Sequence, residues 1–253
     1  MAHSAEAAAA IARLDALTRR LRVECPWDRE QDARTIVPHT VEEAYELADA
    51  ANAGDDAKLL DELGDVLFQV HFLALLLEER GAGSLAQVAE HVHTKLVRRH
   101  PHVFSDTEVA DAGEVLANWD EIKKGETGRE PGIFGDVPEN LPGPLYARKV
   151  QRRAKTSGLA TAPEPAVEAA RALDLVDPQD RDAAFAATGD ALFAAVDAAR
   201  RLGVDPELAL RAAADRFRGR VDAAERLGEQ SGRSWQDLTP HQRLQFYAQA
   251  RRP

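Results

Sequence analysis

The chain has 253 residues, and its 32 lysines and arginines against 43 acidic residues give a formal net charge of −11. With 44% apolar and 30% charged residues it has the composition of a globular protein, long enough for one or two domains. A chain this acidic has no net attraction to nucleic acid or to anionic membranes, so we expect it to bind neither directly. The single cysteine excludes an intrachain disulfide and, with an N-terminus unlike a signal peptide, favours the cytoplasm.

Helical periodicity dominates the first half of the chain. Apolar residues recur at steps of three and four, and β-branched runs are absent. The predicted helices span Ala5–Arg22, Val41–Ala53, Asp56–Arg80, Ser84–Arg99 and Asp111–Lys123, with a capping-box pattern at Thr40–Glu43. The most apolar stretch, Val66–Leu77, is well short of the roughly 20 residues that a bilayer requires. No membrane span is therefore expected.

The second half of the chain is similar to the first, as expected for two copies of one helical module. Glycine and proline cluster around residues 125–144, and helical periodicity resumes at Leu145. The segment Leu60–Phe68 is similar to Phe185–Phe193, offset by 125 residues. The sequence thus predicts an all-α protein with two tandem helix-bundle modules, residues 1–124 and 145–253, joined by a linker at 125–144.

Two neighbouring predicted helices carry a group of carboxylates. Glu43 and Glu46 share one face of the first helix, and Glu62 and Asp65 share one face of the next. Antiparallel packing would bring these pairs together, and four carboxylates beside an apolar core repel unless cations neutralise them. Hard oxygen ligands suit Mg²⁺ or Mn²⁺. A solvated acidic surface is the alternative, although Glu62 and Asp65 lie within the most apolar helix.

The spacing Glu-Glu-x-x-Glu, fifteen residues, Glu-x-x-Asp resembles the signature of the MazG family of nucleoside triphosphate pyrophosphohydrolases. Flanking segments are also similar to that family: Cys25–Asp28 with Gln31, Arg98–Phe104, Trp119–Lys123 and Lys149–Ala154. The resemblance implies all-α modules, usually homodimeric, that hydrolyse a (d)NTP to (d)NMP and pyrophosphate with Mg²⁺. In this chemistry a metal-activated water attacks the α-phosphorus.

The resemblance also implies roles for individual residues. The metal ligands would be Glu43, Glu46, Glu62 and Asp65. Glu42 would be a neighbouring carboxylate that supports the ligands or orients the attacking water, so that Glu42, Glu43 and Glu62 are the catalytic candidates. The substrate-binding candidates are Lys95, Arg98, Arg99 and Lys123 for the phosphates, and Trp119 and Trp27 for the nucleoside. The alternative for Lys95, Arg98 and Arg99 is a solvated basic helix end. The alternative for Trp119 is a core anchor, and Trp27 could instead shape a turn.

The second module lacks most of these carboxylates. Aligning the repeat places Ala169, Ala172 and Ala187 where the first module has Glu43, Glu46 and Glu62, and only Asp65 keeps an acidic counterpart, Asp190. A single carboxylate cannot hold a catalytic Mg²⁺. We therefore expect a catalytically inactive module that serves in packing, dimer contacts or shielding.

Other functions fit parts of the sequence. A helical interaction or regulatory protein would need no metal and would tolerate loss of the carboxylates. A narrow dUTP or dCTP diphosphatase, or a phosphoribosyl-ATP pyrophosphatase, would use the same ligands. A di-iron bundle requires two Glu-x-x-His motifs, and the chain offers one, Glu90–His93. Because Val66–Leu77 is apolar on more than one face, a homodimer is expected.

Overall fold

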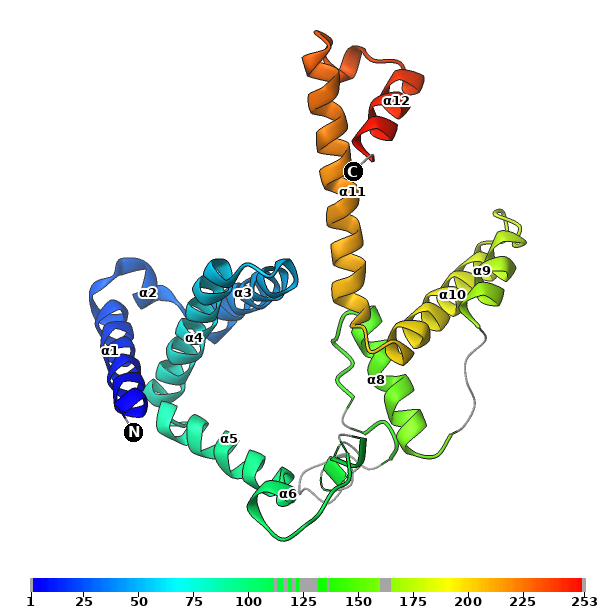
Figure 1. The fold of residues 1–253 in the computed structure, drawn as a ribbon. Helices are drawn as coiled ribbons and strands as arrows, with labels where there is room; N and C mark the ends of the chain where they lie inside the picture. Colours follow the sequence, from blue (N-terminus) through cyan, green and yellow to red (C-terminus); the bar gives the residue numbers. More distant parts are fainter. Residues whose placement is uncertain are drawn as a thin grey trace. The chain divides into compact units, whose positions relative to one another are not determined.

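The computed structural model describes residues 2–111, 113–115, 118–119, 122, 132–135, 137–159 and 165–251. These residues form helices joined by turns and loops and contain no strand, which confirms the predicted all-α class. The chain divides into two compact units, Met1–Glu126 and Thr127–Pro253 (Figure 1). None of the described helices is both long and apolar enough to cross a bilayer.

The first unit is built around a helical hairpin. Its helices are α1 (Ala2–Glu24), α2 (Pro26–Glu30), α3 (Ala33–Ala53), α4 (Asp56–Glu79), α5 (Leu85–Arg99) and α6 (Pro101–Phe104). Helices α3 and α4 pack against each other in antiparallel order through a two-residue turn (Figure 1). Gly54 permits this turn with φ of +69°, and the Asp55 carboxylate caps α4 by accepting from the amides of Ala57 and Lys58.

The start of α3 differs from the prediction. The helix begins at Ala33, eight residues before Val41, because a capping box forms at Asp32: its carboxylate accepts from the amides of Arg34 and Thr35. The predicted capping box at Thr40–Glu43 is therefore wrong, since those residues lie inside the helix. The cap at Asp32 stabilises the first turn, and the helix continues through Pro38.

Two other segments of the first unit can be compared with the helices predicted from the sequence. The short helix α2, which begins at Pro26, was not anticipated. Within the predicted helix Asp111–Lys123, residues 113–115, 118–119 and 122 are helical, whereas Lys123 lies outside the described residues.

One arginine joins three helices around the apolar core. The core consists of Ile36 from α3 with Phe72 and Leu76 from α4. Arg22 of α1 lies over the Phe72 ring at 5.8 Å and donates to both carboxylate oxygens of Glu79, at 2.8 and 2.9 Å. The same guanidinium donates to the backbone carbonyls of Asp28 (2.5 Å) and Gln31 (3.0 Å) around α2. Arg22 thus fixes α1 and α2 onto the carboxyl end of α4.

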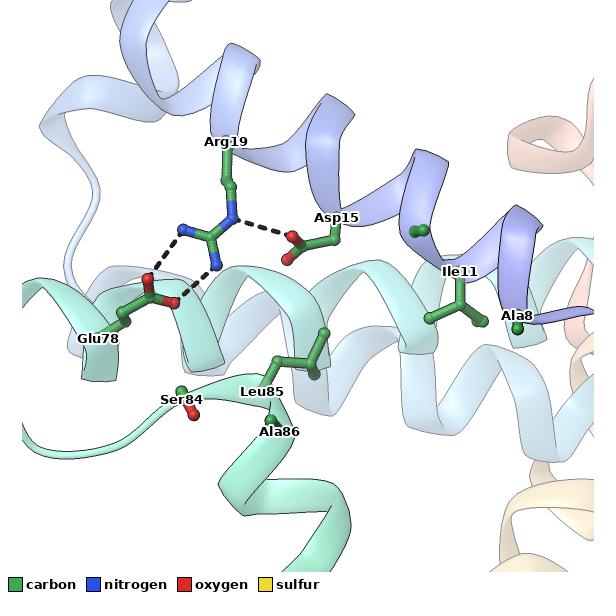
Figure 2. Close-up of a pocket in the computed structure, with 9 residues that line it drawn as sticks. Ala8, Ile11, Asp15, Arg19, Glu78, Ser84, Leu85 and Ala86 are labelled. Carbon is green, nitrogen blue, oxygen red and sulfur yellow. Dashed lines mark hydrogen bonds and ion pairs between the residues drawn. The ribbon is translucent and has the colours of Figure 1, made fainter.

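A second arginine network borders a pocket between α1, α4 and α5. Arg19 donates to Asp15 at 2.9 Å and to both oxygens of Glu78 at 3.1 and 2.6 Å (Figure 2). The pocket, of about 560 Å³, is otherwise lined by Ser84 and by apolar side chains, those of Ala8, Ile11, Ala12, Leu85 and Ala86. Its charged groups are paired with one another, and it includes none of the residues predicted to bind metal or substrate.

The second unit has a comparable set of helix contacts. Its helices are α8 (Gly143–Thr156), α9 (Ala166–Asp174), α10 (Arg181–Arg201), α11 (Pro206–Gln230), the short 3₁₀ helix η1 (Trp235–Asp237) and α12 (Pro240–Ala250). Helix α10 packs against α8 and α9, as α4 packs against α1 and α3. On α10, Asp197 is buried and paired with Arg200 and Arg201.

Candidate metal centre

Three carboxylates converge where α3 packs against α4. One oxygen each from Glu43 of α3 and from Glu62 and Asp65 of α4 lie within 4.8 Å of one another. The three-residue step on α4 places its two carboxylates on one face, and the turn at Gly54 brings α3 alongside. In the described part of the chain, this is the only group of three or more such side chains close enough to hold one ion.

The electrostatics of the cluster favour a cation. Burial raises the pKa of Glu43, and the charges of Asp65, Glu46, Glu62 and Glu42 raise it further. Burial also raises the pKa of Glu62, which is only 5% exposed, and the charge of Glu46 adds to this effect. The negative charges of these carboxylates repel one another, and a bound divalent cation would remove this repulsion. Carboxylate oxygens are also the ligands that such ions prefer.

The other predicted acidic residues surround this group. Glu46 is exposed, and its charge acts on both Glu43 and Glu62 although it lies outside the group of three. Glu42 is exposed, and its carboxylate is 3.8 Å from the Nδ1 atom of His39. Lys58, one turn before Glu62, places its Nζ atom 3.8 Å from the Glu62 carboxylate and partly offsets the negative charge.

Trp27 lies at the edge of the same hairpin. Its indole is 51% exposed, and its ring meets the ring of His39 edge-on, with centroids 5.8 Å apart. His39 is on α3, one turn before Glu43, so this aromatic pair is a neighbour of the carboxylates. Sequence reasoning missed His39, and its spacing of four residues from Glu43 was the available signal.

The predicted phosphate-binding residues are not brought to the carboxylates within this chain. Lys95, Arg98 and Arg99 lie near the carboxyl end of α5, which extends away from the α3–α4 hairpin (Figure 1). The guanidinium of Arg99 lies 6.0 Å from the ring of Trp119, which also approaches the ring of His100 at 6.4 Å. Lys123 lies outside the described residues. Helix α5 packs sparsely on α4 and leaves apolar side chains exposed, those of Val88, Val92 and Leu96.

Comparison with known proteins bears directly on this hairpin. The family model for the MazG nucleotide pyrophosphohydrolase domain matches residues 31–104, which contain all five acidic residues discussed above. The nucleoside triphosphate pyrophosphohydrolase of Escherichia coli is 39% identical over 203 residues, covering 76% of this chain and 77% of that protein. This chain belongs to the MazG family. A second member, the nucleoside triphosphate pyrophosphohydrolase/pyrophosphatase MazG of Thermotoga maritima, is 36% identical over 200 residues, 76% of each chain.

Membership of the MazG family confirms the expected family and enzyme class. The matched segment extends from Gln31 through α3, α4 and α5 to Phe104. Trp27, Trp119 and the whole second unit lie outside it. The roles of individual residues are therefore argued below from the geometry of the site.

Proposed function

We propose that this protein hydrolyses nucleoside triphosphates to nucleoside monophosphates and pyrophosphate at the carboxylate cluster of the first unit. The observation that carries this proposal is the convergence of Glu43, Glu62 and Asp65 within 4.8 Å. A triphosphate repels an acidic protein, so the site needs a cation before it can take this substrate. The cluster provides the carboxylate ligands that would hold this cation.

The cluster is suited to Mg²⁺, with Mn²⁺ as a substitute. Glu43, Glu62 and Asp65 would hold the ion, and Glu46, which lies outside this group but whose charge acts on Glu43 and Glu62, is the candidate for a fourth ligand. When bound, the ion would neutralise phosphate charge and would make water a better nucleophile for the α-phosphorus. Glu42, with His39 at 3.8 Å, is exposed beside the ligands and would orient the attacking water.

The exposed ring of Trp27 and the half-buried ring of His39 would receive the nucleoside. Half of the Trp27 surface is open, and an aromatic face at the edge of a triphosphate site can stack on any base. Trp119 is half-buried and already contacts Arg99 and His100, which supports an anchoring role for it better than a base-binding one.

A homodimer would complete the site. Helix α4 exposes an apolar row that includes Leu60, Leu63, Leu67 and Val70, and α5 exposes a second row along one face. Exposed apolar rows on helices are typical of an interface with another helix. A second copy that covers these rows would also return the basic end of α5 to the carboxylate region, where Lys95, Arg98 and Arg99 could neutralise the leaving pyrophosphate.

The second unit would contribute structure and no chemistry. Its α9–α10 pair corresponds to α3–α4 in its helix contacts, which supports the prediction of a repeated module. The residues aligned with the metal ligands are Ala169, Ala172 and Ala187, of which Ala169 is buried. Alanine offers no ligand atom, so this unit would serve in packing or dimer contacts.

Product analysis tests the proposal. The purified protein is incubated with NTPs and dNTPs, with and without Mg²⁺, beside Glu43→Gln and the control Asp61→Asn, which removes one charge from a nearby exposed position on α4. We expect monophosphate and pyrophosphate only with the metal, loss of turnover in Glu43→Gln and its retention in Asp61→Asn. Diphosphate and phosphate as products would refute attack at the α-phosphorus. No turnover of any nucleotide would favour a binding or regulatory protein on the MazG scaffold.

A further inference from the structure

A single glutamine separates the carboxylate cluster from the apolar core. Along α4 the residues Glu62, Asp65, Gln69, Phe72 and Leu76 follow steps of three and four and occupy one face of the helix. The first two belong to the cluster, and the last two belong to the core. Gln69 lies between these two groups.

The Gln69 side chain has a buried acceptor atom that receives no hydrogen bond from the described residues. It is 93% buried, with 7% of its surface exposed, and its Oε1 atom is shielded from solvent with no partner among the described residues. On α3 the position between Ile36 and Glu43 on the same face is Thr40, whose hydroxyl donates to the Ile36 carbonyl at 3.4 Å. A buried amide oxygen without a donor costs free energy, so a fold retains it where something else supplies the donor.

A second buried glutamine, Gln151, has a structural role in the described part of the chain that Gln69 lacks. Gln151 of α8 is 6% exposed, and its Oε1 also lacks a partner, but its amide nitrogen donates to the Phe193 carbonyl at 2.8 Å. That bond joins α8 to α10 and accounts for a polar residue at this position. Among the described residues Gln69 makes no comparable bond to another helix, so packing alone does not account for its amide.

The register of the hairpin places Gln69 on the nucleoside side of the metal centre. Glu43 lies next to Asp65, and because the helices are antiparallel, four residues back on α3 and four residues forward on α4 move in the same direction. His39 and Gln69 therefore lie at one level, about 6 Å along the hairpin from the carboxylates. Trp27 contacts His39 at this level.

We infer that Gln69 determines substrate specificity by accepting a hydrogen bond from the nucleoside part of the nucleotide. This inference rests on the proposed function and adds a polar contact at the base of the site to the Trp27–His39 pair. The donor is a sugar hydroxyl or a base N–H group, since the Oε1 atom can only accept. Binding of this group would satisfy the oxygen that the free protein leaves without a partner.

Gln69→Met tests the inference because methionine keeps the length and flexibility of the side chain and removes the strong acceptor. Binding is measured by calorimetry in Mg²⁺ with two probes: a nucleotide whose α- and β-phosphorus atoms are joined by a methylene bridge, and inorganic triphosphate. We expect Gln69→Met to weaken the nucleotide roughly 2- to 10-fold, the range of one ordinary hydrogen bond. Affinity for inorganic triphosphate should not change.

Substrate panels then identify the donor. In the wild-type enzyme, kcat/KM is compared across ribo-, deoxyribo- and dideoxynucleotides of one base, and across bases with one sugar. Loss of discrimination along the sugar series in Gln69→Met assigns a hydroxyl, and loss along the base series assigns an N–H group. Either result supports the inference, whereas unchanged ratios in both series overturn it. Absence of turnover in the wild type would instead refute the proposed function.

Thermal unfolding distinguishes a role of Gln69 in substrate recognition from a role in stabilising the fold. Without nucleotide or metal, Gln69→Met should melt at or above the wild-type temperature, because an unpartnered buried acceptor is removed. The matched control Gln151→Met should melt lower, since it breaks the bond to Phe193, and should leave the substrate ratios unchanged. If Gln69→Met melts below the wild type and binds both probes equally less well, Gln69 is structural and the inference fails. Gln69→Leu serves as the second variant if the methionine protein does not fold.

Discussion

Glu62→Gln should stabilise the protein when metal is absent and destabilise it, relative to the wild type, when Mg²⁺ is bound. Glu62 is buried in a seam with Glu43 and Asp65, and its raised pKa means that its ionised form is disfavoured in the folded protein. In EDTA at pH 7, Glu62→Gln removes this repulsion and should raise the melting temperature of the first unit. The variant also loses the contact with Lys58, but that ion pair is 3.8 Å long and half-exposed and contributes little.

In Mg²⁺ the order should reverse. A ligand at 100 times its dissociation constant stabilises the folded state by about 2.7 kcal/mol. For a unit the size of Met1–Glu126, with an unfolding entropy near 0.26 kcal/mol/K, this stabilisation corresponds to a rise of about 10 °C in melting temperature. The wild type should show this rise, and Glu62→Gln should show little of it because an oxygen ligand has lost its charge.

Differential scanning calorimetry of wild type, Glu62→Gln and the control Asp61→Asn, each in EDTA and in saturating Mg²⁺, measures both effects. Asp61→Asn should keep the metal-dependent rise, since its carboxylate lies outside the cluster. A Glu62→Gln protein that gains as much from Mg²⁺ as the wild type would refute the placement of the ion at this cluster.

Three further predictions concern pH, the helix anchor and the second unit. The metal-dependent rise in melting temperature should diminish as the pH is lowered, and should begin to do so above the ordinary glutamate pKa, because Glu43 and Glu62 have raised pKa values and only their ionised forms bind metal. Without metal the protein should instead become more stable as the pH is lowered over this range, because protonation removes the repulsion among the carboxylates. A calorimetric pH series with and without Mg²⁺ measures both effects. Arg22→Lys should lower the free energy of unfolding in urea by about 2–3 kcal/mol, because lysine cannot make the paired bonds to Glu79 and reach two carbonyls as well. Asp190→Ala should retain the kcat/KM of the wild type, and a large loss would contradict an inactive second unit.

The sequence predicted the centre of the site because that part depends on local periodicity. Helix α4 was expected to span Asp56–Arg80 and spans Asp56–Glu79, and its three-residue carboxylate spacing alone puts Glu62 and Asp65 on one face. The short connection at Gly54 then left little choice for the packing of α3. Where structure follows from spacing within about 30 residues, one sequence is sufficient.

Contacts between distant segments were not predictable in the same way. Arg22 appeared as the last basic residue of an amphipathic helix, and nothing in its neighbourhood indicated that it would bind Glu79, 57 residues away. The basic end of α5 was expected to meet the substrate phosphates because the resemblance to the MazG family implied it. In the structure α5 extends away from the α3–α4 hairpin and its apolar row is exposed, and no local spacing in the sequence indicated this orientation (Figure 1).

The α3–α4 seam also explains why this site must be costly to the free protein. The face of α4 that supplies the core side chains Phe72 and Leu76 also carries the carboxylates of Glu62 and Asp65. It also carries the amide oxygen of Gln69, which has no partner among the described residues. Each of these polar groups would be replaced by an apolar one if stability alone were selected. Their unmet demands differ in kind, because the carboxylates require a cation and the amide oxygen requires a hydrogen-bond donor. If a metal–nucleotide complex binds as proposed, it would supply both along one hairpin, so substrate binding should stabilise the first unit more than metal and inorganic triphosphate together.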